Sequence, residues 1–425
     1  KVYVLPRPLP TPVLAFATNE LKCDVGIMVT ASHNPPQDNG YKVYLGGTVD
    51  GIHYRGSQIV SPTDEAIAAK IAAVTSLKSE PRGKVWEVLG EEIVEKYVNR
   101  TASLAGAPGS LRIVYTAMHG VGTETIQRVF QKAGFQSPIL VEAQAAPDPD
   151  FPTVAFPNPE EPGAIDLALE TARSFDAHLV IANDPDADRC AAAVNDPITG
   201  WRMLRGDELG AIFAESIARK IDSGIFANSI VSSSIVKKIA EHYNLEFKET
   251  LTGFKWLAKI ENLTFGYEEA LGYSVDSATV NDKDGVSAAI TLAQIATDLA
   301  AEGKTLLDLL DEVWERHGFH ATEQISIRLS DLSKVGVILG GLRSNPPKEI
   351  AGRSVTAIDD LATPTDGLPP TDGIRIWLDG GVRIIIRPSG TEAKMKCYIE
   401  AIERDSKTAQ VVLDQLRPPL KELLS

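Results

Sequence analysis

Short apolar runs alternate with amphipathic stretches along the first three quarters of the chain, and this alternation limits the possible folds more than any other feature of the sequence. The runs have the length of strands, and the stretches have apolar residues at three- and four-residue spacing, as helices that face a core do. The runs span residues 25–30, 113–116, 179–182, 230–233 and 263–267, and the stretches span 63–75, 123–133, 163–174, 207–220 and 285–302. Strands that alternate with helices form mostly parallel sheets. The sequence therefore predicts an α/β fold.

The C-terminal part of the chain has a different pattern. Residues 373–390 contain two strand-like runs joined by an Asp-Gly-Gly turn, which is a hairpin signal. Residues 393–401 alternate in polarity like a third strand, and 405–424 have a helical pattern. This part is therefore predicted to be a separate α+β domain that begins near 314–320. A Gly- and Pro-containing stretch at 106–110 predicts an earlier domain boundary.

Composition excludes several classes of protein. The 425 residues include 42 basic and 57 acidic side chains, and the formal net charge of −15 argues against a nucleic-acid binder with a general basic surface. No stretch approaches the run of about 18 apolar residues that a membrane helix needs. Cys23, Cys190 and Cys397 form no CxxC pair, so we expect no disulfide, no structural zinc site and a cytoplasmic location. The length predicts about two to four domains.

The loop TASHNPPQDNGYK, residues 30–42, directly follows a strand-like run. A hydroxyl at the carboxyl end of a strand lies where open α/β sheets bind their ligands, which makes Ser32 a candidate nucleophile. Ser32 and the adjacent His33 do not form a hydrolase pair, because triads are built from residues close in space rather than from chain neighbours. The alternative is a strand-to-helix turn in which Ser32 caps the helix. Both interpretations fit this loop taken alone.

The loop NDPDADR follows the run at 179–182 and contains three alternating aspartates, Asp184, Asp186 and Asp188. Their carboxylates can converge from one side of an extended loop into the oxygen-rich site that Mg²⁺ or Ca²⁺ prefers. The loop is not an EF-hand, because Arg189 stands at the sixth position in place of Gly and Asn195 at the twelfth in place of Glu. A metal loop is favoured over a solvated acidic turn, since three carboxylates this close repel one another unless a cation neutralises them.

The loop FGYEEALGY, residues 265–273, carries two adjacent acidic residues after a further strand-like run. Ionised carboxylates of Glu268 and Glu269 at this position can accept hydrogen bonds from sugar hydroxyls. A surface acidic pair is the alternative interpretation.

The loop RPSGTEAKMK lies between two strand-like runs of the C-terminal part. Arg387 can hold phosphate oxygens bidentately, while Ser389, Thr391 and the backbone near Gly390 can form a nest for an anion. Two lysines of the same loop add local positive charge to an acidic protein. The alternative is an ordinary hairpin turn that contains a glycine.

Several common motifs are absent from the sequence. There is no GxxxxGK[ST] loop, no GxGxxG fingerprint, no HExxH and no GxSxG elbow. Nucleotide-driven kinases, dinucleotide oxidoreductases, zinc proteases and α/β-hydrolases therefore lose support. What remains is a serine, a hard metal, an acidic sugar-type loop and a phosphate nest.

These four loops, in this order, resemble those of the α-D-phosphohexomutases, a family that includes phosphoglucomutases and phosphomannomutases. TASHNPP resembles the phosphoserine loop, DPDADR the magnesium loop, GYEEALG the sugar-recognition loop and RPSGTE the phosphate-binding loop. The resemblance implies three doubly wound α/β domains plus a C-terminal α+β domain around a central cleft. We expect the domains at residues 1–106, 107–205, 206–319 and 320–425, with the N-terminal part of the first domain missing from the chain.

The resemblance also implies catalytic roles for individual residues. Ser32 would carry the phosphoryl group, Arg189 would steady that phosphate, and Lys42 would act as general acid/base. His33 is included with them because it adjoins Ser32. The ligands of a Mg²⁺ ion would be the phosphate on Ser32, Asp184, Asp186 and Asp188. The alternative for Lys42 is simply an exposed lysine.

The implied substrate contacts lie in the second half of the chain. Lys255, in the segment TGFKW, would face the substrate, although it too could be an exposed lysine. Glu268 and Glu269 would hold sugar hydroxyls. The phosphate that is not reacting would be bound by Arg387, Ser389, Gly390 and Thr391.

The activity implied is the interconversion of hexose 1-phosphate and hexose 6-phosphate, with glucose or mannose as the sugar, through a phosphoserine and a bisphosphate. A sugar 1,6-bisphosphate would be the activator, and the expected partner is a phosphorylated sugar rather than nucleic acid or a membrane. The protein would be a monomer or homodimer. Ala270 replaces a serine that many family members have, so a phosphopentomutase or a sugar-1,6-bisphosphate synthase is the nearest alternative. A metal-dependent phosphatase and a non-catalytic binding protein are alternatives from other classes.

Overall fold

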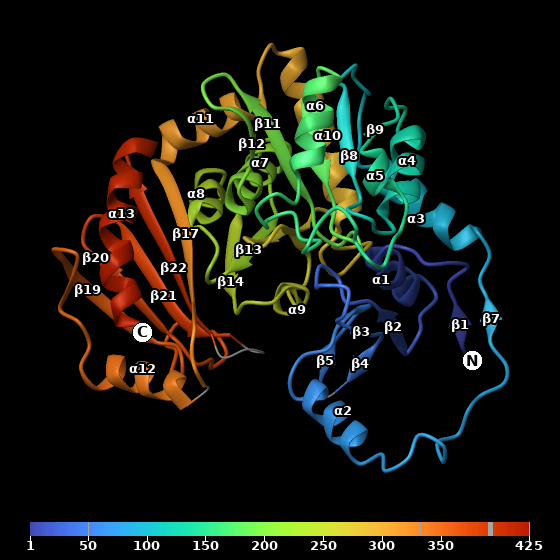
Figure 1. The fold of residues 1–425 in the computed structure, drawn as a ribbon, viewed down its shortest axis with the longest axis horizontal. Coiled ribbons are helices and arrows are strands. Elements are labelled where there is room, and N and C mark those ends of the chain that lie inside the picture. The colour runs from blue at the N-terminus through green and yellow to red at the C-terminus, as the bar shows by residue number, and fades with distance from the viewer. Residues whose placement is uncertain (50, 332, 390–393, 425) are drawn as a thin grey trace.

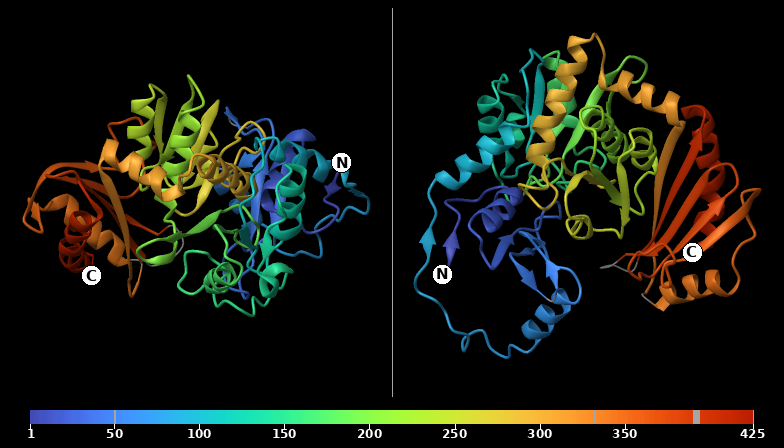
Figure 2. Two further views of the ribbon diagram at one scale, coloured as in Figure 1. Left: turned by 90° about the horizontal axis from the view of Figure 1, so that it is seen from above. Right: turned by 180° about the vertical axis from the view of Figure 1, so that it is seen from behind.

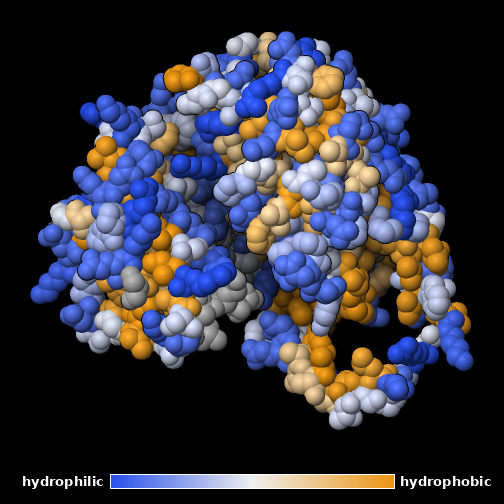
Figure 3. Space-filling view, viewed as in Figure 1, coloured by the Kyte–Doolittle hydropathy of each residue, from blue (hydrophilic) through white to orange (hydrophobic). Residues whose placement is uncertain are grey.

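The computed structural model of the chain describes residues 1–49, 51–331, 333–389 and 394–424. Four groups of strands and helices follow one another along the chain and curve around a common centre (Figure 1). The same succession is seen from behind in Figure 2. The molecular surface is hollowed between the C-terminal group and the others (Figure 3). Within the described ranges, no helix is long and apolar enough to cross a membrane.

The first group is built around a small antiparallel sheet. Its elements are β1 (Tyr3–Val4), α1 (Thr11–Glu20), β2 (Val25–Val29), β3 (Tyr41–Leu45), β4 (Thr48–Val49), β5 (Ile52–His53), β6 (Ser57–Gln58), α2 (Thr63–Ala72), β7 (Glu87–Val88) and α3 (Glu92–Ala102). The strand order is β2-β3-β6, and β2 runs antiparallel to β3, with Val25 opposite Leu45. The prediction of parallel strands does not hold for this sheet, because the loop after β2 leads straight back into the neighbouring strand.

The second group contains a five-stranded mixed sheet. Its elements are β8 (Ile113–Thr116), α4 (Gly122–Lys132), β9 (Ile139–Leu140), α5 (Glu142–Ala145), α6 (Asp166–Ser174), β10 (Leu179–Ala182), β11 (Ala191–Asp196) and β12 (Gly200–Met203). The strand order is β12-β11-β10-β8-β9, with β8 parallel to both β9 and β10. All residues of β8 and β10 are buried, as the continuous apolar runs predicted. The polar segment 183–190 follows the end of β10.

The third group contains a four-stranded sheet in the order β14-β13-β15-β16. Its elements are α7 (Gly206–Ala218), β13 (Ile225–Ser229), α8 (Ile235–His242), β14 (Glu246–Thr250), α9 (Phe254–Leu257), β15 (Leu263–Glu268), β16 (Gly272–Ser274), α10 (Gly285–Ala301) and α11 (Leu306–His317). The strand predicted at 230–233 is wrong, because β13 ends at Ser229. Ser232 N–H donates to Ser229 O at 3.0 Å, which turns the chain toward α8.

The fourth group is an antiparallel six-stranded sheet with helices, as the C-terminal pattern predicted. Its elements are β17 (Phe319–Arg328), α12 (Ser333–Ser344), β18 (Glu349–Ile350), β19 (Arg353–Asp360), β20 (Ile374–Leu378), β21 (Val382–Pro388), β22 (Lys394–Glu403) and α13 (Ser406–Leu423). The strand order is β17-β22-β21-β20-β19-β18. The hairpin predicted at the Asp-Gly-Gly turn is confirmed, with Leu378 opposite Val382.

The buried apolar residues divide the molecule unevenly. One continuous cluster extends from Leu9 to Val313 and so includes residues of the first three groups. A separate cluster extends from Ala321 to Leu424 within the fourth group. A small third cluster joins the two parts and consists of Ile230, Val231, Leu251, Leu361, Ile385 and Tyr398. The separate C-terminal core agrees with the predicted α+β domain, while the predicted boundaries between the other domains stay predictions.

Candidate active site

The loop between β10 and β11 brings three buried aspartates together. Asn183 fixes the start of this loop, because it accepts a hydrogen bond from Tyr115 Oη at 2.8 Å and donates one to Gly285 O at 3.1 Å. One carboxylate oxygen from each aspartate lies within 4.8 Å of the other two, and the aspartates are Asp184, Asp186 and Asp188. The alternating spacing in the sequence therefore produces the convergence expected of a metal loop.

Two lysines face the three carboxylates. Lys42 Nζ donates to Asp186 Oδ2 at 2.7 Å and also pairs with Asp188, whose Oδ2 lies 2.9 Å from Lys283 Nζ. Burial opposes ionisation of Asp188, but Lys283 and Lys42 outweigh it and hold the pKa of Asp188 well below its usual range. Burial and the two neighbouring carboxylates raise the pKa of Asp184 to about 8. The two lysines thus match the charge of two carboxylates, and ionisation of the third at neutral pH requires a further cation.

The aspartate cluster fits a divalent metal ion. Asp188 Oδ1 is buried and has no hydrogen-bond partner among the described residues. A buried carboxylate oxygen without a donor is costly unless a cation contacts it. Carboxylate oxygens are also the ligands that Mg²⁺ and Ca²⁺ prefer. The three aspartates therefore meet the requirements of a hard-cation site.

Ser32 and Lys42 reach this cluster from the connection between β2 and β3. Ser32 has a left-handed backbone with a φ of 54°, and its N–H donates to Thr30 Oγ1 at 2.9 Å. The Ser32 hydroxyl lies 3.0 Å from Asp184 Oδ2 and 2.9 Å from Asp186 Oδ1. The structure therefore excludes a helix-capping role for this serine, since its hydroxyl is bound by two carboxylates far away in the sequence.

Arg189 and His33 complete the group of predicted catalytic residues. The backbone N–H of Arg189 donates to Asp184 Oδ1 at 3.0 Å, and its buried Nε has no hydrogen-bond partner within the described part of the chain. His33 Nδ1 lies 3.2 Å from the Ser32 hydroxyl. Burial, followed by the charge of Arg189, lowers the pKa of His33 to about 3, so its imidazole is neutral near pH 7. Arg189 Nε lies 4.0 Å from Asp184 Oδ2, the oxygen that the Ser32 hydroxyl also contacts, and can thus donate a hydrogen bond to an anion there.

The loop after β15 carries Glu268 and Glu269, whose carboxylates have different partners. Glu268 Oε1 accepts a hydrogen bond from Gly253 N at 2.6 Å. Glu269 Oε2 accepts hydrogen bonds from Ser232 Oγ at 2.9 Å and Ser229 Oγ at 3.2 Å. Burial raises the pKa of both glutamates. They are half-buried and held in place, unlike an ordinary surface acidic pair.

Lys255 lies in the short helix α9. Its Nζ is 3.5 Å from Asp64 Oδ2 of α2, and both side chains are about one third exposed, at 36% and 35%. This ion pair links the third group of elements to the first. The role of Lys255 toward a substrate stays a prediction.

Arg387 lies near the end of β21, and Ser389 directly follows that strand. Ser389 N–H donates to Lys394 O at 2.8 Å. Burial and then the charge of Arg387 lower the pKa of Lys396, Lys394 adds to this effect, and the carboxylate of Glu269 opposes it. The other predicted residues of this loop lie outside the described residues and are Gly390 and Thr391.

Two residues near the cluster were missed by the sequence reasoning. Lys283 lies in the segment NDKDG directly before α10, and Thr11 begins α1 and donates to Asp186 Oδ2 at 2.5 Å. A lysine between two aspartates was the available signal for Lys283, but such a pattern is common on protein surfaces. Nothing in the sequence pointed to a role for Thr11 at the aspartate cluster, since a threonine at a helix start is typical of a capping residue.

Comparisons with known proteins match all four groups of elements. The matching families are phosphoglucomutase/phosphomannomutase alpha/beta/alpha domains I, II and III, at residues 1–78, 92–200 and 205–317, and the C-terminal domain at 343–416. A Haemophilus influenzae protein named "probable phosphomannomutase" is 47% identical over 430 residues, which span 100% of this chain and 87% of the relative. The chain belongs to the phosphoglucomutase/phosphomannomutase family. The resemblance seen in the four loops is thereby confirmed, as is the class of enzyme, a phosphotransferring mutase.

Other members of the phosphoglucomutase/phosphomannomutase family are more distant. A mouse phosphopentomutase is 34% identical, over 94% of this chain and 70% of its own length. The fold is shared with a solved structure of a family member from Burkholderia thailandensis, with a TM-score of 0.72 at 20% identity over 98% of this chain and 81% of that one. The Paramecium phosphoglucomutase parafusin, in an open form, also has a TM-score of 0.72, at 18% identity over 99% of this chain and 83% of its own. The predicted four-domain fold class is therefore confirmed.

Proposed function

We propose that this mutase interconverts hexose 1-phosphates and hexose 6-phosphates, with glucose or mannose as the sugar, through a phosphoserine at Ser32. The observation that carries the proposal is the position of the Ser32 hydroxyl, within 3.0 Å of carboxylate oxygens from both Asp184 and Asp186. A nucleophile beside a hard-cation site is the arrangement that phosphoryl transfer needs, because the phosphoryl group must be oriented and its charge neutralised.

Mg²⁺ is the cation that we propose for this site. The three aspartates with the partnerless Asp188 Oδ1 would hold it together with the phosphate on Ser32. When bound, the ion supplies neutralisation of charge on the transferring phosphoryl group. Arg189 Nε, which has no hydrogen-bond partner among the described residues, would bind another oxygen of the same group.

Lys42 is proposed to move the protons. Burial alone would lower its pKa, but Asp186 and Asp188 outweigh burial and raise it, so Lys42 is an ammonium near neutral pH. When a sugar hydroxyl oxygen bonds to phosphorus, the bond from phosphorus to Ser32 Oγ breaks. Lys42 can give a proton to Ser32 Oγ, and the amine that remains can accept the proton that the sugar hydroxyl loses. His33, which is neutral and 3.2 Å from Ser32 Oγ, would only orient that hydroxyl.

The remaining predicted residues would bind the substrate. Glu268 and Glu269 would accept hydrogen bonds from sugar hydroxyls, and Lys255 would face the sugar phosphate. The phosphate that is not reacting would be bound by Arg387, Ser389, Gly390 and Thr391. One such distant phosphate site serves both directions of the reaction. When the bisphosphate rotates within the cleft, either of its two phosphates can face Ser32 while the other occupies this site. A sugar 1,6-bisphosphate would accordingly activate the enzyme by phosphorylating Ser32.

A mutase assay tests this proposal. The protein is incubated with Mg²⁺, a trace of sugar 1,6-bisphosphate and, in turn, the 1-phosphates of glucose, mannose and ribose. We expect turnover of at least one hexose 1-phosphate at least about tenfold faster, by kcat/KM, than of ribose 1-phosphate. Equal or faster use of ribose 1-phosphate contradicts the hexose assignment.

A phosphopentomutase or a sugar-1,6-bisphosphate synthase is the second candidate function. Two observations favour it, namely Ala270 in the sugar loop and relatives from mouse and human, 34% and 33% identical, that are named phosphopentomutase. The assay above tests the pentose candidate. The synthase is identified if bisphosphate accumulates without isomerisation when an acyl phosphate is added as the phosphoryl donor. In either case the proposed roles of Ser32 and the three aspartates are unchanged.

We also propose the domain limits 1–106, 107–205, 206–319 and 320–425, a cytoplasmic location and a monomeric or homodimeric state. The three cysteines support the location, since all are free thiols. Light scattering of the purified protein decides the oligomeric state.

A further inference from the structure

The segment 229–234, which we call the serine loop, holds one of the two glutamates of the sugar-recognition loop. Ser232 Oγ donates to Glu269 Oε2 at 2.9 Å, and Glu269 N–H donates to Ser232 Oγ at 3.1 Å. Ser229 Oγ donates to the same carboxylate oxygen at 3.2 Å. Both serines are fully buried, at 0% exposure. The orientation of the Glu269 carboxylate is therefore fixed by where the serine loop lies.

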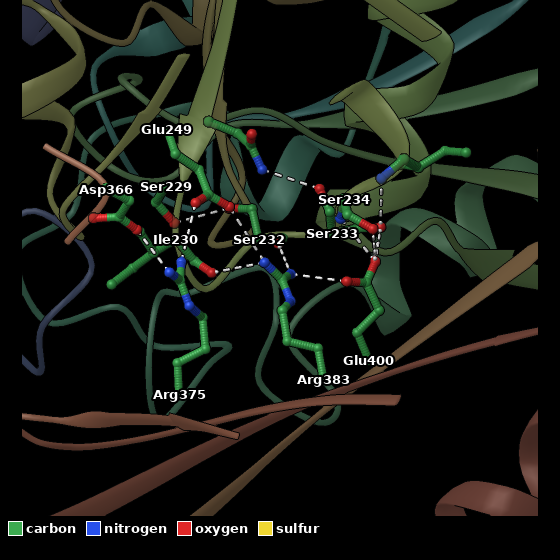
Figure 4. Close-up of polar contacts among 12 residues, drawn as sticks. Ser229, Ile230, Ser232, Ser233, Ser234, Glu249, Asp366, Arg375, Arg383 and Glu400 are labelled. Atoms are coloured by element: carbon green, nitrogen blue, oxygen red, sulfur yellow. Dashed lines mark hydrogen bonds and ion pairs between the residues drawn. The ribbon is translucent and has the colours of Figure 1, made fainter. Parts of the chain in front are cut away.

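The serine loop is in turn held by the C-terminal domain (Figure 4). The guanidinium of Arg383, in β21, donates to Ile230 O at 3.1 Å and also to Ser232 O. Arg383 is 4% exposed and pairs at 2.9 Å with Glu400 Oε2 of the adjacent strand β22. The other Glu400 oxygen accepts a hydrogen bond from Ser233 Oγ at 2.6 Å. One buried arginine and one buried glutamate thus bind the backbone and side chains of a single loop.

Arg383 shares its strand with Arg387. Side chains alternate between the two faces of a strand, so residues four positions apart point to the same face. At about 3.3 Å per residue, their Cα atoms are about 13 Å apart. The arginine that holds the serine loop and the arginine proposed to bind the distant phosphate are therefore parts of one rigid element.

We propose that Arg383 is a positioning residue that sets the distance between the sugar-binding carboxylate of Glu269 and the phosphate-binding Arg387. It acts through the Ile230 and Ser232 carbonyl oxygens on the serine loop, and through the Ser232 hydroxyl on Glu269. Arg383 itself does not bind the substrate. This inference rests on the proposed function, because it gives a role to the same sugar and phosphate contacts.

Arg375 provides a matched control within the same interface. It lies in β20 and is 8% exposed, so it is buried almost as fully as Arg383. Its guanidinium pairs with three carboxylates, those of Glu249 at 3.2 Å, Asp359 at 2.9 Å and Asp366 at 2.6 Å. Arg383 also pairs with carboxylates, those of Glu400 at 2.9 Å and Glu249 at 3.4 Å, but it differs from Arg375 in that it donates to backbone carbonyls of the serine loop. Replacement of either arginine by lysine keeps the charge and removes the planar fork that binds two acceptors.

The test compares Arg383→Lys and Ser232→Ala with the controls Arg375→Lys and Ser174→Ala, the latter at an exposed serine whose hydroxyl donates to Glu170 O within α6. Dissociation constants for glucose 1-phosphate and inorganic phosphate are measured by calorimetry, together with kcat and the melting temperature. We expect Arg383→Lys and Ser232→Ala to weaken glucose 1-phosphate binding about tenfold, because a hydrogen bond to a charged group is misplaced, while inorganic phosphate binding changes less than about twofold. Both controls should stay within about twofold for both ligands.

A double variant separates positioning from general destabilisation. Arg383→Lys combined with Ser232→Ala should weaken glucose 1-phosphate binding by much less than the product of the single effects. Both substitutions disturb the same contact, that between Ser232 and Glu269. Unchanged binding in Ser232→Ala, or equal effects of Arg383→Lys and Arg375→Lys, overturns the inference. Wild-type protein that binds glucose 1-phosphate without turning it over overturns the proposed function alone, because the binding comparison still decides the role of Arg383. Wild-type protein that does not bind it overturns both.

Discussion

The Ser32 hydroxyl lies 3.0 Å from Asp184 Oδ2, although the two residues are 152 positions apart in the chain. One comes from the connection between β2 and β3 and the other from the loop after β10. Neither loop alone has a nucleophile and a cation site together. The chemistry therefore depends on how the first and second groups of elements pack.

Replacement of Ser32 by alanine should abolish turnover. Without the hydroxyl no phosphoserine forms, so we expect mutase activity below about a thousandth of the wild-type value and no uptake of label from a labelled sugar 1,6-bisphosphate. Ser61→Ala is the control, because Ser61 is exposed and its hydroxyl donates to the nearby Glu65. Retention of a tenth or more of the activity by Ser32→Ala, about the level of a modest structural effect, would show that another group carries the phosphate.

Replacement of Asp188 by asparagine should weaken metal binding. The amide has no negative charge to offer a cation, whereas Asp188 Oδ1 is a buried carboxylate oxygen with no hydrogen-bond partner in the part of the chain that the structure describes. We expect the dissociation constant for Mg²⁺ or Mn²⁺, measured by calorimetry, to rise at least about tenfold, and the stabilisation of the protein by added Mg²⁺ to disappear. Asp284→Asn is the control, since Asp284 is a buried helix cap outside the cluster. An unchanged metal affinity in Asp188→Asn contradicts the proposed site.

Lys259 should make the stability depend on pH. Its Nζ lies 3.8 Å from the centre of the Tyr54 ring and donates to Gln58 O at 2.9 Å. Burial, helped by the nearby Arg55 and Lys255 charges, lowers its pKa to about 7.

The sign of this dependence follows from proton binding. Between pH 7 and about 10 the unfolded chain holds a proton on Lys259 that the folded protein has released, so stability from this group rises with pH. The unfolding free energy of the wild type should increase relative to that of Lys259→Met over this range, with a constant difference below about pH 6. Urea denaturation at several pH values measures the unfolding free energy of each variant. Lys237→Met is the control, because Lys237 is exposed. Parallel profiles for wild type and Lys259→Met contradict the prediction.

Gly120 should not tolerate a side chain. A Cβ at this position would overlap the backbone of Pro185, which lies within the metal loop, and Val121 N–H already donates to Pro185 O at 2.8 Å. Gly120→Ala should therefore lower the unfolding free energy by about 1–3 kcal/mol and weaken Mg²⁺ binding. Gly340→Ala, in the open face of α12, should instead stabilise the protein by up to about 1 kcal/mol. Urea denaturation compares the two, and equal stability of both variants is the contrary result.

Local patterns in the sequence were sufficient for part of the fold and of the site. The aspartates of NDPDADR and the serine of TASHNPP could be predicted because a buried strand followed by polar residues places those side chains at a sheet edge. The C-terminal hairpin could be predicted because Asp-Gly-Gly permits the positive φ that Gly380 adopts.

Other features depend on partners distant in the sequence. The antiparallel pairing of β2 with β3 is a choice of neighbour that apolar runs do not specify. Residues 230–233 have the composition of a strand, yet Arg383 and Glu400 bind them as a loop from more than 150 positions away. Lys283 joins the aspartate cluster only because α10 packs beside it. These contacts are decided by tertiary packing, which a single sequence does not reveal.

The single apolar cluster that runs from Leu9 to Val313 sets a limit on how this enzyme can be recombined. If any one of the first three domains is exchanged with that of a relative, side chains from two different proteins must pack together in this shared core. Exchange of residues 320–425 leaves that cluster intact and requires that the small cluster around Ile385, the serine-loop contacts and polar contacts such as Arg375–Glu249 and Thr322–Asp207 be matched. The C-terminal domain is thus the natural unit for chimeras. A C-terminal domain from a relative would also set its own distance between the phosphate-binding and sugar-binding residues.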